Sequence, residues 1–515
     1  MIKLKALLSN KWFFPILMLY YGMFYILFGE SYPFNEGLCT DGYVYRSFFP
    51  DFRNSVFFDT YYVHRIFPSF LLSVFFKFLS ISLAGKNIYI AFQILNLTSI
   101  VTACYFFKQI LVLFKISLKN QLFAFALLLL NFGVIKFAFY LPVMTDTFAM
   151  MLSTALLYFY LKNNIIGIVT CTILLAFTWP MAYYQGLLLI AFPICILPLV
   201  PPLKWQKILI QGISILYVSV LCVFFVFISK LDNNTIDFFI MKIDRTLLPI
   251  SILGIVVLYF FFSKLFFNKT LLDKSLFFAK LNYKRLLISI GVFVLVLLII
   301  QVIHPMSTAS YSTSQIFSDV TLISLIKPLI SIVSDFSYFG IAVCFLILFW
   351  SSFCKTLTQM GWGLVAALGM NIFFFGITPE SRHLINILPW LIVLLIKAIN
   401  KYSFKTSFYV VTGLLSFAAS KIWLLLNIYS SNSKIWHSLN VTTDNSSLNI
   451  DKNGSLGFPS QLLWMNIGPW MSERMYFVQG AVMLLFIAIL FFMLYKFQMN
   501  EFKKVRLVRR YQILE

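Results

Sequence analysis

RLLISIGVFVLVLLIIQVI, residues 285–303, carries a single charged residue, Arg285, at its first position. A run of this length and apolarity is long enough to cross the hydrocarbon core of a bilayer as an α-helix. Runs of 16 to 27 such residues recur along nearly the whole chain, which is 61% hydrophobic and 11% charged with a mean hydropathy of +0.89. We therefore predict an all-α polytopic membrane protein.

The basic residues lie mainly in short segments between the apolar runs, as expected when positive charge stays on the cytoplasmic side of a membrane. Basic segments also precede the first run (3–11) and follow the last (503–510), which predicts that both termini are cytoplasmic. The pattern predicts 14 membrane-spanning helices, with 12 to 15 as the range. They are 12–29, 88–114, 121–141, 146–161, 164–179, 183–203, 208–229, 247–263, 285–303, 337–353, 360–376, 383–399, 406–428 and 478–496.

The apolar segment 66–84 (IFPSFLLSVFFKFLSISLA) differs from the other apolar runs in its charge and its position. Lys77 lies near its middle, and the segment directly follows a charged loop. If it crossed the membrane, Lys115 and Lys119 would lie outside and the side of every later loop would invert. We therefore predict a helix that lies in the outer interface or re-enters it, within a first outer loop of residues 30–87.

The first outer loop is rich in charged residues. Residues 30–65 (ESYPFNEGLCTDGYVYRSFFPDFRNSVFFDTYYVHR) contain five of the 18 acidic residues of the chain. On the predicted topology 15 of the 18 acids, and all four histidines, lie outside or at the outer edge of a span. The functional face is therefore predicted to be external, and we expect a multi-pass protein of the bacterial inner (cytoplasmic) membrane with its active site facing outward.

The motif TDGYVYRS (40–47) suits transfer of a sugar from a phosphate leaving group. Such a transfer needs a carboxylate to deprotonate the incoming hydroxyl and cations to hold the phosphate. Asp41 suits the first role, and Arg46, with Arg53 or Arg65, the second, because guanidinium matches phosphate as a fork. Tyr43 is a candidate for substrate binding. The alternative is a solvated loop with incidental ion pairs.

Two further motifs lie at predicted outer span mouths. His64 and Arg65 immediately precede the interfacial helix. An arginine at this depth can bind a lipid phosphate headgroup. The alternative is an arginine that only extends to the interface within an aromatic belt. Asp146, in PVMTDTFAM (142–150), opens a span at its outer end. A carboxylate is favoured there by the helix dipole in any case, so a capping role and a catalytic role both stay open.

Charged residues also precede the two later spans 383–399 and 478–496. The segment ITPESRHLINILPW (377–390) places Glu380, Arg382 and His383 at the outer end of an apolar helix. Arg382 is suited to bind a phosphate there, and Glu380 is suited to orient it. The alternative is an ion pair that tethers the loop. Trp470, in GPWMSERMY (468–476), is a candidate for stacking on a sugar ring or a member of the interfacial aromatic belt.

The sequence disfavours nucleic-acid binding, ATP-driven transport, zinc proteolysis and a nucleotide-binding domain. The net charge of +22 is distributed as membrane topology requires, without nucleic-acid motifs, so no nucleic-acid partner is expected. P-loop, H-E-x-x-H and G-x-G-x-x-G motifs are missing, as is a close Cys/His set. The seven cysteines form no disulfide framework. We assign no metal ligands and expect no certain cofactor, although a divalent metal stays possible.

Taken together, these motifs resemble the GT-C superfamily of polytopic membrane glycosyltransferases. The resemblance rests on the order of four landmarks: an early loop acid (Asp41), R-x-x-P before the interfacial helix (Arg65, Pro68), P-x-x-T-D (Pro142, Asp146) and E-x-R-H-L-x-x-x-L-P (Glu380, Arg382, Pro389). It implies a polyprenyl-phosphate-linked sugar donor in contact with membrane lipid and inverting transfer to an extracytoplasmic glycan, lipid or protein. It also implies that the early loop acid is the base. A catalytic module over 1–400 would be followed by a transmembrane hairpin, 401–515, with a long outer loop at 429–477.

The chain departs from protein mannosyltransferases of this superfamily because Gly42, rather than a second acid, follows Asp41. Metal dependence and acceptor class therefore stay open. A lipid-linked glycan flippase or polymerase would carry cationic residues through its central spans, where we find few. A secondary transporter would need broken helices and acids at the midplane. Convergence of Asp41, Asp146, Glu380 and Arg382 on one site would favour the transferase.

Overall fold

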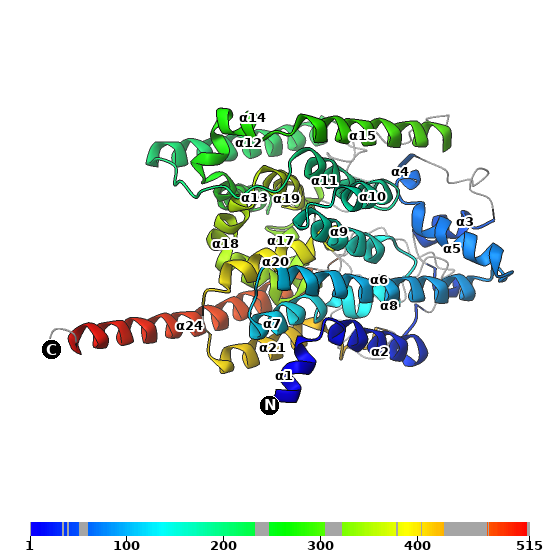
Figure 1. Ribbon diagram of the computed structural model, residues 1–515, viewed down its shortest axis with the longest axis horizontal. Helices are drawn as coiled ribbons and strands as arrows, with labels where there is room; N and C mark the ends of the chain where they lie inside the picture. Colours follow the sequence, from blue (N-terminus) through cyan, green and yellow to red (C-terminus); the bar gives the residue numbers. More distant parts are fainter. Residues whose placement is uncertain are drawn as a thin grey trace.

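The computed structural model describes residues 2–32, 35–38, 41–50, 60–231, 247–303, 322–376, 378, 380–402, 404–426, 471 and 473–511. All regular elements within these ranges are helical (Figure 1). The predicted all-α class is therefore confirmed for the described part of the chain.

The helices of the first half include the short elements of the first predicted outer loop. In chain order they are α1 (Ile2–Ser9), α2 (Phe13–Phe28), η1 (Asn35–Gly37), α3 (Asp41–Ser47), α4 (Thr60–Val63), α5 (Phe67–Phe78), α6 (Gly85–Leu113), α7 (Leu118–Leu129), the π-helix η2 (Gly133–Phe137), α8 (Ala138–Tyr140), α9 (Asp146–Leu161), α10 (Ile165–Ala176) and α11 (Pro180–Ala191).

The second half contains the longest apolar helices. They are α12 (Lys204–Leu231), α13 (Leu248–Phe262), η4 (Ser263–Phe266), η5 (Lys269–Leu272), α14 (Lys274–Lys280), α15 (Tyr283–Ile303), α17 (Ile330–Phe339), α18 (Ile341–Gln359), α19 (Trp362–Phe375), η6 (Ser381–Leu384), α20 (Leu388–Ile399), α21 (Thr406–Ser420) and α24 (Glu473–Tyr511).

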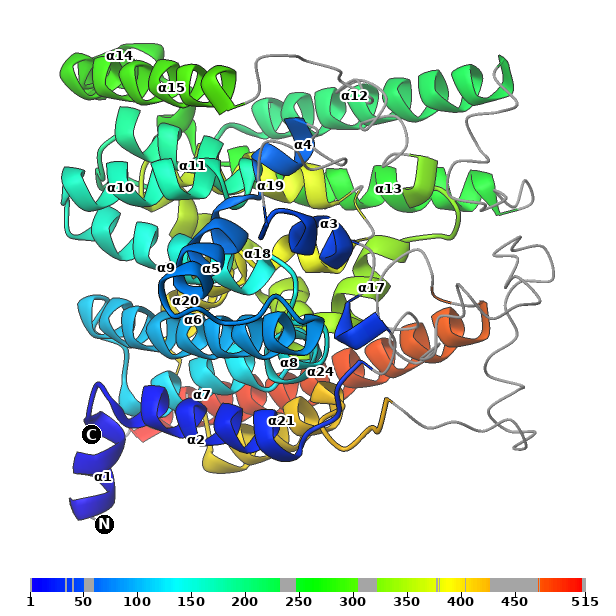
Figure 2. The ribbon, with the colours of Figure 1, turned by 90° about the vertical axis from the view of Figure 1, so that its right-hand side faces the viewer.

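The helices are stacked in layers around α20. In both ribbon views α12, α14 and α15 form one edge of the molecule, and α2 and α21 lie at the opposite edge (Figures 1 and 2). Almost every side chain of α20 is buried, as expected of a helix that is apolar all round. Its Trp390 donates a hydrogen bond from Nε1 to the carbonyl oxygen of Ser153 in α9, at 2.8 Å. The buried core extends from α20 through α9 to α6, α7 and α18.

Six helices among the described residues are long and apolar enough to cross a membrane: α6, α12 up to Val223, α13 with η4, α15, α18 and α24 up to Lys496. A seventh arises if α7 and the η2–α8 segment, which meet at a bend of 59°, count as one span. Large apolar side chains are exposed along these helices, for example Leu287 and Leu298 of α15, which are 68% and 54% exposed. These features support a multi-pass membrane protein.

The other predicted spans coincide with shorter helices, so 14 crossings are not confirmed. The segment predicted as 183–203 shows why: α11 ends at Ala191, and residues 193–203 contain four prolines, which cannot donate backbone hydrogen bonds to a helix. The predicted span 337–353 begins instead with α18, because Gly340 adopts φ +62° and separates it from α17. The apolar pattern located these helices but misplaced their ends.

The predicted interfacial segment 66–84 contains only α5, a helix of 12 residues with Pro68 in its first turn. At about 1.5 Å per residue it is roughly 18 Å long, whereas a bilayer core is about 30 Å thick. In Figure 1 α5 lies together with α3 and α4 at the right-hand end of the molecule. Helix length does not separate α5 from α10, α11 and α20, which also have 12 residues, so its interfacial position stays a prediction.

The predicted boundary between residues 400 and 401 does not separate the packing of the two parts. In α21, Tyr409 donates a hydrogen bond to Asn120 of α7 at 2.7 Å. In α24, the ring of Phe486 packs edge-on against Phe336 of α17, with centroids 5.6 Å apart. The two-part division stays a prediction, and the C-terminal helices share the core of the preceding ones.

Candidate functional site

The site begins where the first outer loop joins α5. The guanidinium of Arg65 lies 4.5 Å from the ring centroid of Trp179, and its side chain is 6% exposed. Two contacts hold this junction against the loop between α10 and α11: Nδ1 of His64 donates to the carbonyl oxygen of Ala176 at 2.9 Å, and the Phe67 amide donates to Phe177 at 2.8 Å. Arg65 is thus fixed by stacking on an aromatic ring.

Trp179 links Arg65 to the second predicted motif. Its ring lies 5.3 Å from that of His383, centroid to centroid. His383 Nε2 is 2.9 Å from Glu380 Oε2, and Arg382 Nη2 is 3.4 Å from Glu380 Oε1. The structure therefore brings Arg65 and the Glu380–His383 segment together, although more than 300 residues separate them in sequence.

Positive charge dominates this cluster. Burial by itself would raise the pKa of the Glu380 carboxyl. Arg382 and His383, with a smaller contribution from Arg65, outweigh burial and hold that pKa well below its usual range. Glu380 is therefore ionised at neutral pH, and the two arginines exceed it in charge. Burial lowers the pKa of His64, the hydrogen bond to Ala176 partly offsets this effect, and the charge of Arg65 adds to it, so the neutral form is favoured.

Asp146 lies beside the same cluster, at the first position of α9, where its carboxylate is 2% exposed. The preceding loop approaches Arg382 directly, because Arg382 Nη1 lies 3.5 Å from the sulfur of Met144. Asn96 of α6 fixes this loop by donating to the carbonyl oxygens of Ala138 and Pro142 at 2.8 and 3.0 Å. The loop that leads into Asp146 therefore contacts the arginine cluster through Met144.

The helix that carries Asp41 packs on this loop as well. A β-carbon at Gly42 in α3 would lie 3.4 Å from Cβ of Val143, an ordinary van der Waals contact. The backbone of Asp41 and Tyr43 belongs to α3, but their side chains lie outside the described residues, as does Trp470. The position of α3 is consistent with a shared site.

Arg46 has a different neighbourhood from the one expected. Its Nη1 lies 3.5 Å from Glu36 Oε2, and the two side chains are 39% and 54% exposed. Glu36 in turn contacts the start of α6, because a β-carbon at Gly85 would overlap its carboxylate. Within the described contacts Arg46 thus belongs to an exposed ion pair, as in the alternative interpretation of the loop, rather than to the Arg65–Arg382 cluster.

Sequence reasoning missed the contribution of α17. Ser334 Oγ and Ser381 Oγ are 2.5 Å apart, which ties α17 to the segment between Glu380 and Arg382. Asp335 also hydrogen-bonds Ser381, and its burial raises its pKa well above the usual range. The signal available in the sequence was an acid within the apolar stretch LISIVSDFSYFGIAVCF (329–345), which usually marks a polar interior.

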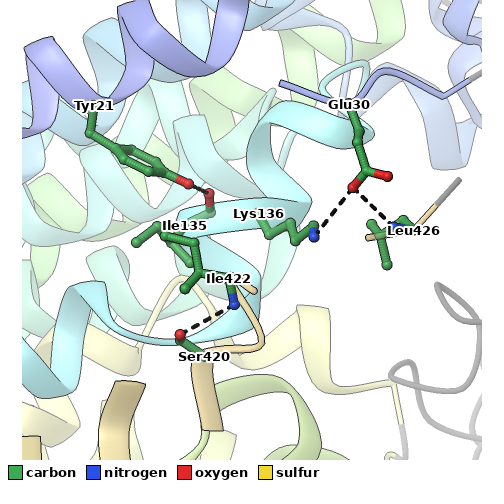
Figure 3. A network of polar contacts seen from close by, with 7 residues as sticks. All are labelled: Tyr21, Glu30, Ile135, Lys136, Ser420, Ile422 and Leu426. Atoms are coloured by element: carbon green, nitrogen blue, oxygen red, sulfur yellow. Dashed lines mark hydrogen bonds and ion pairs between the residues drawn. The ribbon is translucent and has the colours of Figure 1, made fainter. Parts of the chain in front are cut away.

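A second buried ion pair lies between α2, η2 and the end of α21 (Figure 3). Lys136 Nζ is 3.3 Å from Glu30 Oε2, and the two side chains are 3% and 19% exposed. The same Glu30 oxygen accepts a hydrogen bond from the Leu426 amide at 2.9 Å. Lys421, at the end of α21, donates to Ser337 Oγ and its carbonyl oxygen, both at 2.8 Å. These lysines, expected within spans, are therefore buried and bonded.

Within the described residues no group of three or more His, Cys, Asp or Glu side chains is arranged to hold a metal ion. Comparison with family models, with curated proteins and with solved structures finds no match for this chain. The site is interpreted below from its own geometry.

Proposed function

We propose that this protein is a membrane glycosyltransferase of the GT-C type that moves a sugar from a polyprenyl-phosphate donor to an extracytoplasmic acceptor by inverting transfer. The observation that carries the proposal is the cluster of Arg65, Glu380 and Arg382. Two arginines arranged around one carboxylate at the mouths of apolar helices suit a phosphate at the surface of a bilayer.

Each residue then has a role set by its chemistry. Arg382 and Arg65 bind the phosphate of the donor, and Glu380 orients Arg382. Asp41 removes the proton of the acceptor hydroxyl, while Asp146 stands beside Arg382 and helps to position the sugar. The negative charge that develops on the departing phosphate is stabilised by guanidinium groups whose orientation is already fixed by Trp179 and Glu380.

The proposal includes a topology for which the long apolar helices provide general support. Fourteen crossings would place both termini in the cytoplasm, with α5 in the outer interface of a bacterial inner membrane. The shorter helices α9, α10, α11 and α20 would then be crossings enclosed by longer, lipid-facing helices. The arginine cluster would face outward.

Replacing Asp41 with Asn tests the catalytic assignment. Asn keeps the size of the side chain but cannot take a proton, so single-turnover transfer should slow by roughly 10²–10⁴-fold. Donor binding should persist, because arginines elsewhere hold the phosphate. Asp51→Asn and Asp59→Asn in the same loop are matched controls that should retain most of their activity.

Near-normal turnover of Asp41→Asn would remove Asp41 as the base. Equal losses of folded protein in all three variants would instead indicate a structural role of the loop. The measurement is transfer from purified, folded variants with radiolabelled polyprenyl-phosphate sugars, alongside donor binding.

A flippase or transporter for a lipid-linked glycan is the second candidate, and one observation favours it. The α7–η2 segment is bent by 59°, and it carries the buried Lys136. Broken helices with buried charges are common in transporters. Movement of a labelled polyprenyl-linked glycan across vesicles containing the pure protein, without sugar transfer, would support this candidate against the transferase.

A further inference from the structure

One buried hydroxyl group adjoins the candidate site without a bonding partner. The side chain of Tyr338 in α17 is completely buried, and its hydroxyl hydrogen-bonds no residue in the described part of the chain. A buried hydroxyl without a partner loses its hydrogen bonds to water and destabilises the fold. Such a group calls for an explanation, and function at a binding site is one of the recognised ones.

The position of Tyr338 follows from the geometry of α17. Ser334, one helical turn earlier and on the same face, contacts Ser381 directly before Arg382. On its other side the Tyr338 ring packs against Phe137 of η2, with centroids 5.5 Å apart. A β-carbon at Gly133 would overlap this ring, so the glycine permits the close approach. Tyr338 thus lies between the Arg382 segment and the η2 segment that leads towards Asp146.

The electrostatic surroundings agree with this placement. Burial raises the pKa of the Tyr338 phenol well above its usual range, Asp146 raises it further, and Arg382 lowers it. The phenol therefore keeps its proton at neutral pH and acts as a hydrogen-bond donor. Both a carboxylate and a guanidinium of the candidate site are close enough to influence it.

We propose that Tyr338 is a substrate-binding residue whose hydroxyl donates a hydrogen bond to an oxygen of the donor headgroup held between Asp146 and Arg382. The inference rests on the proposed function and adds a donor that the sequence motifs did not contain. The oxygen belongs either to the phosphate or to the sugar, and the two sources are separable by experiment.

The test compares Tyr338→Phe with Tyr160→Phe. Tyr160 is also buried, but its hydroxyl already donates to the carbonyl oxygen of Phe192 at 3.1 Å. It lies 14 residues beyond Asp146 in the same helix, about 21 Å along its axis. Without ligand, Tyr338→Phe should unfold at the same temperature as the wild type or higher, whereas Tyr160→Phe should unfold at a lower temperature.

Ligand binding should show the reverse pattern. We expect Tyr338→Phe to bind a polyprenyl-phosphate sugar roughly tenfold to 100-fold more weakly, the loss typical of a hydrogen bond to a charged group, and Tyr160→Phe to bind it normally. Weaker binding of polyprenyl phosphate without a sugar as well would place the hydroxyl on the phosphate. Weaker binding of the sugar-bearing lipid alone would place it on the sugar.

The proposed function and the role of Tyr338 fail in different ways. If neither lipid binds the wild type, the proposed donor is wrong, and the role of Tyr338 in binding that donor falls with it. If both lipids bind the wild type and Tyr338→Phe equally well, the Tyr338 inference is overturned while the donor stands. A drop in the unfolding temperature of Tyr338→Phe as large as that of Tyr160→Phe would also overturn it.

Discussion

Replacing Glu30 with Gln removes the only acidic partner that Lys136 has among its described contacts. Lys136 is 3% exposed, so the substitution leaves an ammonium buried without a compensating charge. Breaking a buried pair in this way costs about 3–5 kcal/mol, and the 19% exposure of Glu30 places the expected loss near the lower end, about 3 kcal/mol. Glu36→Gln is the matched control, because the Glu36–Arg46 pair is exposed and should contribute only about 0–1 kcal/mol.

The assay is reversible unfolding of the purified variants in mixed micelles, measured as the free energy of unfolding. Lys136→Met combined with Glu30→Gln should recover most of the loss, because the buried charge is then gone as well. A double-mutant cycle should give a coupling energy of about 2 kcal/mol, within the range of contacting residues. Equal costs for Glu30→Gln and Glu36→Gln, within about 0.5 kcal/mol, would refute the argument that burial decides the strength of these pairs.

Three other outcomes are expected. Arg65→Lys and Arg382→Lys should each weaken binding of a polyprenyl-phosphate donor, because a lysine cannot reproduce the fork of a guanidinium; full donor affinity and activity in both variants would contradict the assignment. Because the folded pKa of Glu380 is depressed, its contribution to stability is present above about pH 4.3, the unfolded value, and is lost as the pH falls through the folded value. The unfolding free energy of the wild type should therefore fall more steeply in acid than that of Glu380→Gln, and parallel curves would argue against the ion cluster. In a background without other reactive thiols, cysteine at Lys86 should react with an impermeant reagent from outside and cysteine at Ser117 should not; outside labelling at Ser117 would invert the proposed topology.

The amino-acid sequence determined the helical class and much of the helix placement. The span predicted over 146–161 coincides with α9, and that over 285–303 lies within α15. Apolar runs specify helices locally because a backbone without water must satisfy its own hydrogen bonds. Glu380, Arg382 and His383 were recognisable as a group because a short turn keeps them together.

Only the tertiary structure decided which of these groups meet. Arg65 stacks on Trp179, and Ser381 meets Ser334, because separate helices pack side by side. A helix that is apolar apart from one lysine in its last turn, such as α20, carries little local signal of which neighbour lies against each side. The bend of 59° after α7 and the burial of Lys136 beside Glu30 arise from the same packing. The local apolar sequence determines where helices form. The site depends on how side chains from helices that are distant in sequence pack against one another.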